Sequence, residues 1–349
     1  MQETGLVLAG GGGKGIYQVG MLKSLAEAGL LDSVTAVAGT SIGSVNAAIF
    51  TEGIANYKKM NPEKEGIHDA VLSAVSKMEK VWDDIDSKVF FNIDYSQINA
   101  GDTHFSRNAT SQLIDKYLDY GLFQCEDTLP TFCTTAACPP DVISSEQVTD
   151  QEMKLLLSAS VDETYRDYRA EYMSLNNQDK ERIKNIILAT TSLPVIYAPV
   201  NIEGQLYLDG GVKDNVPIKP LYDMGIRRFI VIELSNERGF DESSFPDAEI
   251  IDIIPSHDLG SLLSGTMNFD KEDKSVKKEI GVRDGRRYIK TLFEKDEIYI
   301  KLEKELAMRD YENIIQMRDF NRKYSSLSKD VNSRFDYINN LEESLKKYE

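Results

Sequence analysis

The chain has 349 residues, of which 41% are hydrophobic, and this composition predicts a globular protein and excludes wholesale disorder. The formal net charge of −17 is unevenly placed, because residues 1–267 carry −18 and residues 268–349 carry +1. A body this acidic argues against a nucleic-acid ligand and against purely electrostatic docking on anionic lipid.

Targeting and metal-binding signals are missing from the sequence. No apolar run approaches the roughly 20 residues that span a bilayer, and the first residues lack the basic region of a signal peptide. We therefore expect a cytoplasmic protein that makes at most peripheral contact with a membrane, although export without a cleaved signal would leave no trace. The cysteines are odd in number and lack paired metal-ligand spacing, so we interpret them as reduced structural thiols: Cys125, Cys133 and Cys138.

The first 38 residues alternate between strand and helix. Residues 5–9 are predicted to form a short buried strand that runs into a glycine-rich loop at residues 10–15. Residues 16–28 show helical spacing and end at Gly29, and residues 30–38 return to a strand. This order is typical of an α/β sheet whose active edge lies at the carboxyl ends of its strands.

A Gly-x-Ser-x-Gly segment follows that strand and precedes a helical run. Its serine is Ser41, between Gly39 and Gly43. Such a turn is the nucleophile elbow of serine hydrolases, since a turn this sharp admits only glycine on either side of the serine. The alternative is an ordinary strand–turn–helix corner with a serine near a helix N-cap. The pattern alone does not decide between them.

The middle of the chain loses the strand rhythm, and we predict a helical insertion at about residues 52–185. Residues 67–85 and 108–120 carry apolar stripes at helical spacing, which favour packing in the core over a lid that touches the membrane. Residues 130–136 are strand-like, and the polar stretch 141–185 is predicted to be mostly helical. Further strands are expected at residues 204–208, 228–234 and 249–254.

Residues 293–349 form a charged helical extension. Apolar residues recur there at alternating spacings of three and four, with one break at Arg334. The pattern fits a helical hairpin that packs on its own domain, with a bend near Ser325, and equally a helix for homo-oligomerisation or for docking a protein partner. The positions of the repeat are Met317, Phe320, Tyr324, Leu327, Val331, Arg334, Ile338, Leu341, Leu345 and Tyr348.

Three motifs together supply what acyl transfer needs. The glycine loop at residues 10–15 lets backbone N–H groups converge on a carbonyl oxygen and form an oxyanion hole. Ser41 supplies a nucleophile. Asp209, followed by Gly210 and Gly211, supplies a carboxylate that can take the serine proton if burial raises its pKa.

These motifs, in this order, resemble those of the patatin-like phospholipase family over residues 5–292. That resemblance implies a three-layer α/β fold with a central, mostly parallel sheet, in a domain of residues 1–292 followed by the extension 293–349. It implies a lipid acyl hydrolase of the phospholipase A or lysophospholipase type, with membrane lipid as substrate through transient peripheral contact and with neither metal nor cofactor. It also implies a Ser–Asp dyad of Ser41 and Asp209, supported by the loop Gly10, Gly11, Gly12, Gly13, Lys14 and Gly15 and by the motif glycines Gly39, Gly43, Gly210 and Gly211.

Three other functions compete with this one. The glycine loop also satisfies a dinucleotide-binding fingerprint, with Asp32 as its acidic partner. The order of Ser41, Asp209 and His257 is that of an α/β-hydrolase triad, although a histidine in a loop needs no catalytic reason. A catalytically idle assembly module is the third, and its weakness is that all three motifs are intact.

Overall fold

The computed structural model describes residues 3–64, 66–85, 107–140, 142, 165–194, 196–293, 306, 309, 312–320 and 323. The chain divides into two compact units, Met1–Lys295 and Asp296–Glu349. In the second unit, residues 312–320 are helical and expose Met317 and Phe320. The rest of the predicted heptad repeat and the bend near Ser325 lie outside the described residues, and a separate domain from residue 293 stays a prediction.

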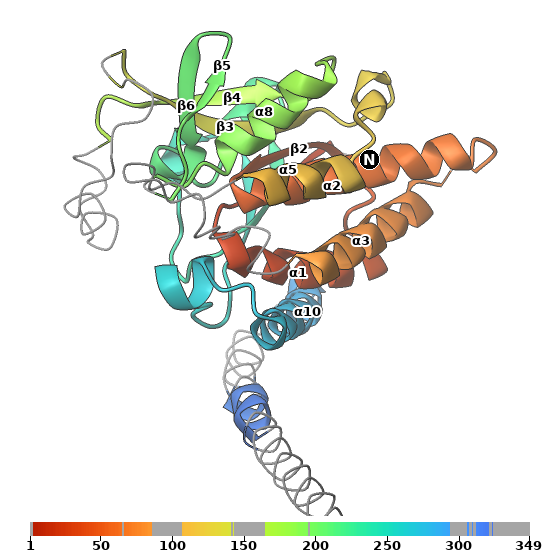
Figure 1. Ribbon diagram of the computed structural model, residues 1–349. Helices are drawn as coiled ribbons and strands as arrows, with labels where there is room; N and C mark the ends of the chain where they lie inside the picture. Colours follow the sequence, from red (N-terminus) through yellow and green to blue (C-terminus); the bar gives the residue numbers. More distant parts are fainter. Residues whose placement is uncertain are drawn as a thin grey trace, which may run out of the picture. The chain divides into compact units, whose positions relative to one another are not determined.

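Eight strands of the described residues form one mixed sheet in the first unit, in the order β5-β6-β3-β2-β1-β7-β8, with β4 paired to β3 (Figure 1). The pairs β1–β2, β1–β7, β2–β3 and β7–β8 are parallel, whereas β4 and β6 join β3 in antiparallel fashion. The strands are β1 Thr4–Leu8, β2 Val34–Thr40, β3 Thr131–Ala137, β4 Arg169–Ser174, β5 Val200–Ile202, β6 Gln205–Asp209, β7 Arg228–Ile232 and β8 Glu249–Ile253. The predicted α/β class with a mostly parallel central sheet is confirmed.

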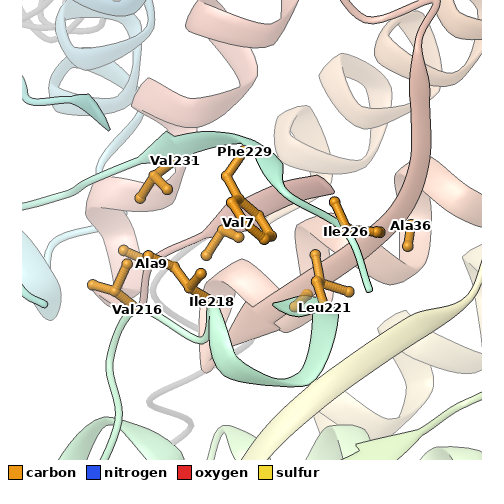
Figure 2. Packing of buried hydrophobic residues seen from close by; sticks show 10 residues of the cluster. Val7, Ala9, Ala36, Val216, Ile218, Leu221, Ile226, Phe229 and Val231 are labelled. Atoms are coloured by element: carbon orange, nitrogen blue, oxygen red, sulfur yellow. The ribbon is translucent and has the colours of Figure 1, made fainter. Parts of the chain in front are cut away.

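Both faces of the sheet are covered. Successive side chains of a strand point to opposite faces, so alternate residues of β1, β2 and β7 form one cluster with Ile218 and with Leu221 of α9 (Lys219–Asp223). Figure 2 shows this cluster, which includes Val7, Ala36 and Phe229. The helix α2 (Ile42–Met60) packs on β1, β2 and β3, and α8 (Lys180–Thr190) packs on β3, β5 and β6.

Other helices of the first unit pack on one another, and they approach closely where a residue lacks a side chain. The helix α1 (Ile16–Glu27) lies against α10 (Lys271–Phe293), and a Cβ atom on Gly20 would overlap the carbonyl oxygen of Lys278 (Figure 1). The helix α3 (Ile67–Asp84) lies against α2 and α1. Because α10 packs closely on α1, residues 271–293 belong to the first unit.

One prediction for the middle of the chain is wrong. Residues 169–174 form strand β4 instead of a helix, and they pair antiparallel with β3. The charged residues Arg169 and Glu171 in this half-exposed strand made it resemble a solvated helix. The predicted insertion does contain the helices α3 and α5 (Asn108–Tyr117) and the short 3-10 turn Tyr120–Gln124. None of the helices that the structure describes is long and apolar enough to cross a membrane.

Candidate active site

Strand β3 brings the predicted nucleophile and base together. Thr134 pairs with Thr40 of β2, and Thr135 pairs with Asp209 of β6. Both threonines also pair with β4, which occupies the opposite edge of β3. The strands β2 and β6 therefore share one edge of β3, run in opposite directions and end at the same place. Ser41, the residue after Thr40, consequently meets Asp209.

Ser41 occupies a strained turn. It has φ 54° and ψ −124°, a conformation that L-residues rarely adopt and that costs about 1–3 kcal/mol. A Cβ atom on Gly39 would overlap the backbone of Gly43, and one on Gly43 would overlap the carbonyl oxygen of Leu8. Both glycines are therefore required by close approach of the backbone. The helix α2 begins at Ile42, so its positive end faces the serine.

Thr190, at the end of α8, anchors this turn. Its Oγ1 accepts a hydrogen bond from the Ser41 N–H at 2.9 Å and donates one to the carbonyl oxygen of Thr134 at 2.5 Å. The Ser44 hydroxyl lies 3.0 Å from the same Oγ1 and donates to the carbonyl oxygen of Gly39. The elbow is thus tied to β3 and α8, a role that nothing in the sequence around Thr190 indicated.

Asp209 is almost fully buried, with 3% of its surface exposed. Its carboxylate accepts a hydrogen bond from the Gly211 N–H at 2.8 Å and lies close to the Ser41 hydroxyl, a second donor. Burial raises the pKa of the Asp209 carboxyl to about 6, although those two donors and the positive charge of Arg107 lower it. The group can therefore be ionised and still accept a proton near neutral pH.

The glycine loop is held open beside Ser41. Gly10 donates its N–H to the carbonyl oxygen of Asn215, and the Asn215 side chain donates back to the Gly10 carbonyl oxygen, each at 3.2 Å. Gly12 has φ +53° and begins the 3-10 helix Gly12–Gly15. The first N–H groups of a helix have no acceptor within it, so the N–H of Gly12 is available to a ligand.

A buried polar chain supports this loop from behind. Gln18 donates to the carbonyl oxygen of Ala9 at 2.8 Å, and Asn46 donates to Gln18 at 2.9 Å and to the carbonyl oxygen of Gly15 at 3.1 Å. Trp82 donates to Asn46 at 2.9 Å. Both ends of the loop are thereby fixed by side chains with at most 1% exposure. Sequence reasoning missed Gln18 and Asn46, because polar residues in a helix usually face water.

Ser41, Asp209 and the start of the glycine loop line a largely apolar cleft of about 390 Å³. Of the predicted site residues, six line it: Gly10, Gly11, Gly12, Ser41, Asp209 and Gly211. The others are not among the lining residues: Gly13, Lys14, Gly15, Gly39, Gly43 and Gly210. Apolar groups supply much of the remaining surface, namely Ile42, Leu193, Pro194, Tyr197, Val212, Met267 and Phe269.

Lys14, which was predicted as part of the loop that supports the dyad, is not among the residues that line the cleft. Its aliphatic chain lies near Gly265, and burial lowers the pKa of Lys14, with Asp258 opposing this effect and Lys277 adding to it. The Lys14 amine therefore lies near Asp258 and Lys277, neither of which lines the cleft.

The histidines of the competing triad are engaged elsewhere. Nδ1 of His257 lies 2.7 Å from the Ser256 hydroxyl, and His257 does not line the cleft. Nδ1 of His68 lies 3.1 Å from Asp32, the acid of the dinucleotide fingerprint. His104 lies outside the described residues. Within the described part of the chain, no group of three metal-ligating side chains comes together.

Comparisons with known proteins bear on this site. The family model described as "Patatin-like phospholipase" matches residues 6–222. "Lysophospholipase NTE1" of Cryptococcus neoformans is 23% identical over 236 residues, which cover 67% of this chain and 11% of that protein. "Patatin-like phospholipase domain-containing protein 6" of Homo sapiens is 28% identical over 244 residues, covering 70% of this chain and 14% of that protein. The chain thus spans a small fraction of the curated relatives that it matches.

Among solved structures, VipD from Legionella pneumophila aligns with a TM-score of 0.38 and 14% identity, over 83% of this chain and 67% of that chain.

Proposed function

This chain belongs to the patatin-like phospholipase family, and we propose that it hydrolyses a carboxylic ester of a lipid through an acyl-Ser41 intermediate. The observation that carries the proposal is the meeting of Ser41 with the buried Asp209 carboxylate in one cleft, at the shared edge of β3. The pairing of β2 and β6 along one edge of β3 supports a direct pair of Ser41 and Asp209 with no histidine between them.

The reaction begins when Asp209 takes the proton of Ser41 as the serine oxygen attacks the ester carbonyl. The carbonyl oxygen becomes an oxyanion, which the N–H groups of Gly11 and Gly12 and the positive end of α2 stabilise. The carbon–oxygen bond of the ester then breaks, and the protonated Asp209 gives its proton to the departing alcohol. Water attacks the acyl-Ser41 ester with Asp209 again as base, and this step releases the acid and restores the serine.

The apolar lining of the cleft suits the acyl chain of the substrate. Ile42, Leu193 and Phe269 offer it a surface without charge. Phospholipids or lysophospholipids are the proposed substrates, in keeping with the names of the relatives. We propose that the protein meets the bilayer transiently, through apolar residues near the cleft.

The test compares the wild type with Ser41→Ala on p-nitrophenyl esters of graded chain length and on whole membranes, with lipid products identified by mass spectrometry. Ser243→Ala, which removes an exposed hydroxyl in a surface turn, is the matched control. We expect loss of ester hydrolysis and of free fatty acid release in Ser41→Ala alone. Equal rates in all three proteins would refute the proposal. His257→Ala should remain active, and its inactivity in a folded protein would instead favour the triad.

A further inference from the structure

Arg107, the residue before α5, places a cation close to the candidate dyad. One guanidinium nitrogen donates to the carbonyl oxygen of Leu188 at 2.5 Å, and another donates to the Ser192 hydroxyl. The guanidinium carbon lies 4.4 Å from the centre of the Tyr197 ring, which lines the cleft. Neither the predicted motifs nor the proposed steps use this residue.

The contacts of Arg107 lead directly to Asp209. The carbonyl oxygen of Ser192 accepts the Asp209 N–H at 2.9 Å, while the hydroxyl of the same serine accepts from Arg107. Arg107 therefore holds the segment that fixes the end of β6. Its Nε atom is buried and has no hydrogen-bond partner among the described residues. Burial lowers the pKa of Arg107, whereas Tyr197 and then the Asp209 carboxylate oppose this effect.

The electrostatic surroundings of Asp209 are accordingly simple. Arg107 faces it from the α5 side, the Ser41 hydroxyl from the elbow, and the Gly211 N–H from its own loop. Charged groups nearby on β4 and after β6 are directed to other partners: Glu171 to Tyr207, Lys213 to the carbonyl oxygen of Tyr165, and Asp214 to Tyr172.

We infer that Arg107 is a positioning residue for the Asp209 base, and that its charge favours the ionised carboxylate. The inference rests on the proposed function for its catalytic meaning. Burial lowers the pKa of Arg107 to about 10, so the cation persists across the range in which the Asp209 carboxyl titrates. An opposite charge that favours the ionised carboxylate extends activity to lower pH.

The experiment measures kcat/KM against pH for the wild type, Arg107→Met and Arg107→Lys. The acid limb of this profile reports the base of the free enzyme. We expect Arg107→Met to shift this acid limb to higher pH and Arg107→Lys to leave it near the wild-type pH. For an upward move of one pH unit, kcat/KM at pH 6 falls about fivefold and kcat/KM at pH 9 is unchanged. Ser192→Ala, which keeps the charge, should also leave the limb in place.

A second measurement is independent of catalysis. Carbon-13 NMR of labelled aspartate carboxyls, assigned with Asp209→Asn, follows the titration of Asp209 itself in the same variants. An upward move of this titration in Arg107→Met but not in Arg107→Lys supports the inference, even if hydrolysis proves independent of Ser41 and the proposed function fails. An unmoved titration in folded Arg107→Met overturns it. If that variant does not fold, Arg107→Gln, which can still donate to Leu188, is compared by the same criteria.

Discussion

Replacing Asp209 by asparagine should abolish hydrolysis and at the same time stabilise the protein. Asparagine resembles the protonated carboxyl in shape and can still accept the Gly211 N–H. It removes the need to hold a negative charge in a site with 3% exposure. The gain in stability should depend on pH, because aspartate resembles asparagine only while it is protonated.

The pKa of the Asp209 carboxyl is raised from 3.8 to about 6 in the folded protein. A raised pKa means that the folded state binds the proton more tightly than the unfolded state, so ionisation of Asp209 destabilises the fold. This cost is absent below pH 3.8, grows as the pH rises through 6 and is complete above it. At 1.36 kcal/mol for each pKa unit, it amounts to about 3 kcal/mol at pH 8 and roughly half of that at pH 5.

The assay is urea-induced unfolding of the wild type and Asp209→Asn at several values between pH 5 and pH 8. Asp115→Asn is the control of opposite sign, because hydrogen bonds from Lys184 and Lys180 lower the pKa of the Asp115 carboxyl to about 2. That variant should be less stable than the wild type by the same amount at every pH in this range, because the Asp115 carboxyl is ionised in both the folded and the unfolded state above pH 5. The reasoning about burial is refuted if the gain in Asp209→Asn is the same at every pH, or if the variant is less stable than the wild type.

Three further predictions follow from close contacts. Gly43→Ala should cost about 3 kcal/mol of unfolding free energy, because its Cβ atom would overlap the Leu8 carbonyl oxygen. Gly66→Ala, whose Cβ atom would face open space, should cost less than about 1 kcal/mol in the same urea unfolding assay. Gln18→Met should lower kcat about 10- to 100-fold with little change in KM, because the glycine loop loses its support while the helix keeps its volume; a wild-type kcat would contradict this role. Lys14→Gln should leave kcat/KM for phospholipid esters nearly unchanged, and a large loss would return Lys14 to the substrate site.

The spacing of apolar residues was sufficient to predict the strands and helices that are defined by residues close together in the sequence. The strand at residues 5–9, the helix at residues 16–28 and a strand within residues 30–38, which begins at Val34, are confirmed, because short apolar runs and a longer helical run differ in length and periodicity. Gly29 does end its helix with φ +71°. The fold class followed from the order of these elements.

Residues that act across the fold left no such signal. Thr190 and Asn46 have ordinary helical neighbours, and their role depends on backbone groups that lie far away in the sequence. The strand β4 was mistaken for a helix because one of its edges pairs with β3 while its side chains remain half exposed. The contact of Arg107 with Ser192 spans 85 residues. Single-sequence periodicity carries no information about pairings of this kind.

The arrangement is consistent with the proposed pairing of a serine with an aspartate. The positive φ of Ser41 and the buried charge of Asp209 both cost free energy. Pairing with strand β3 offsets this cost for Asp209, and the contact with Thr190, which is hydrogen-bonded to β3, offsets it for Ser41. A residue held by sheet register cannot relax independently of the sheet. The approach of Ser41 to Asp209 therefore depends on the fold as a whole, so substitutions on β3 that disturb its pairing with β2 or β6 should reduce hydrolysis even when they touch neither residue.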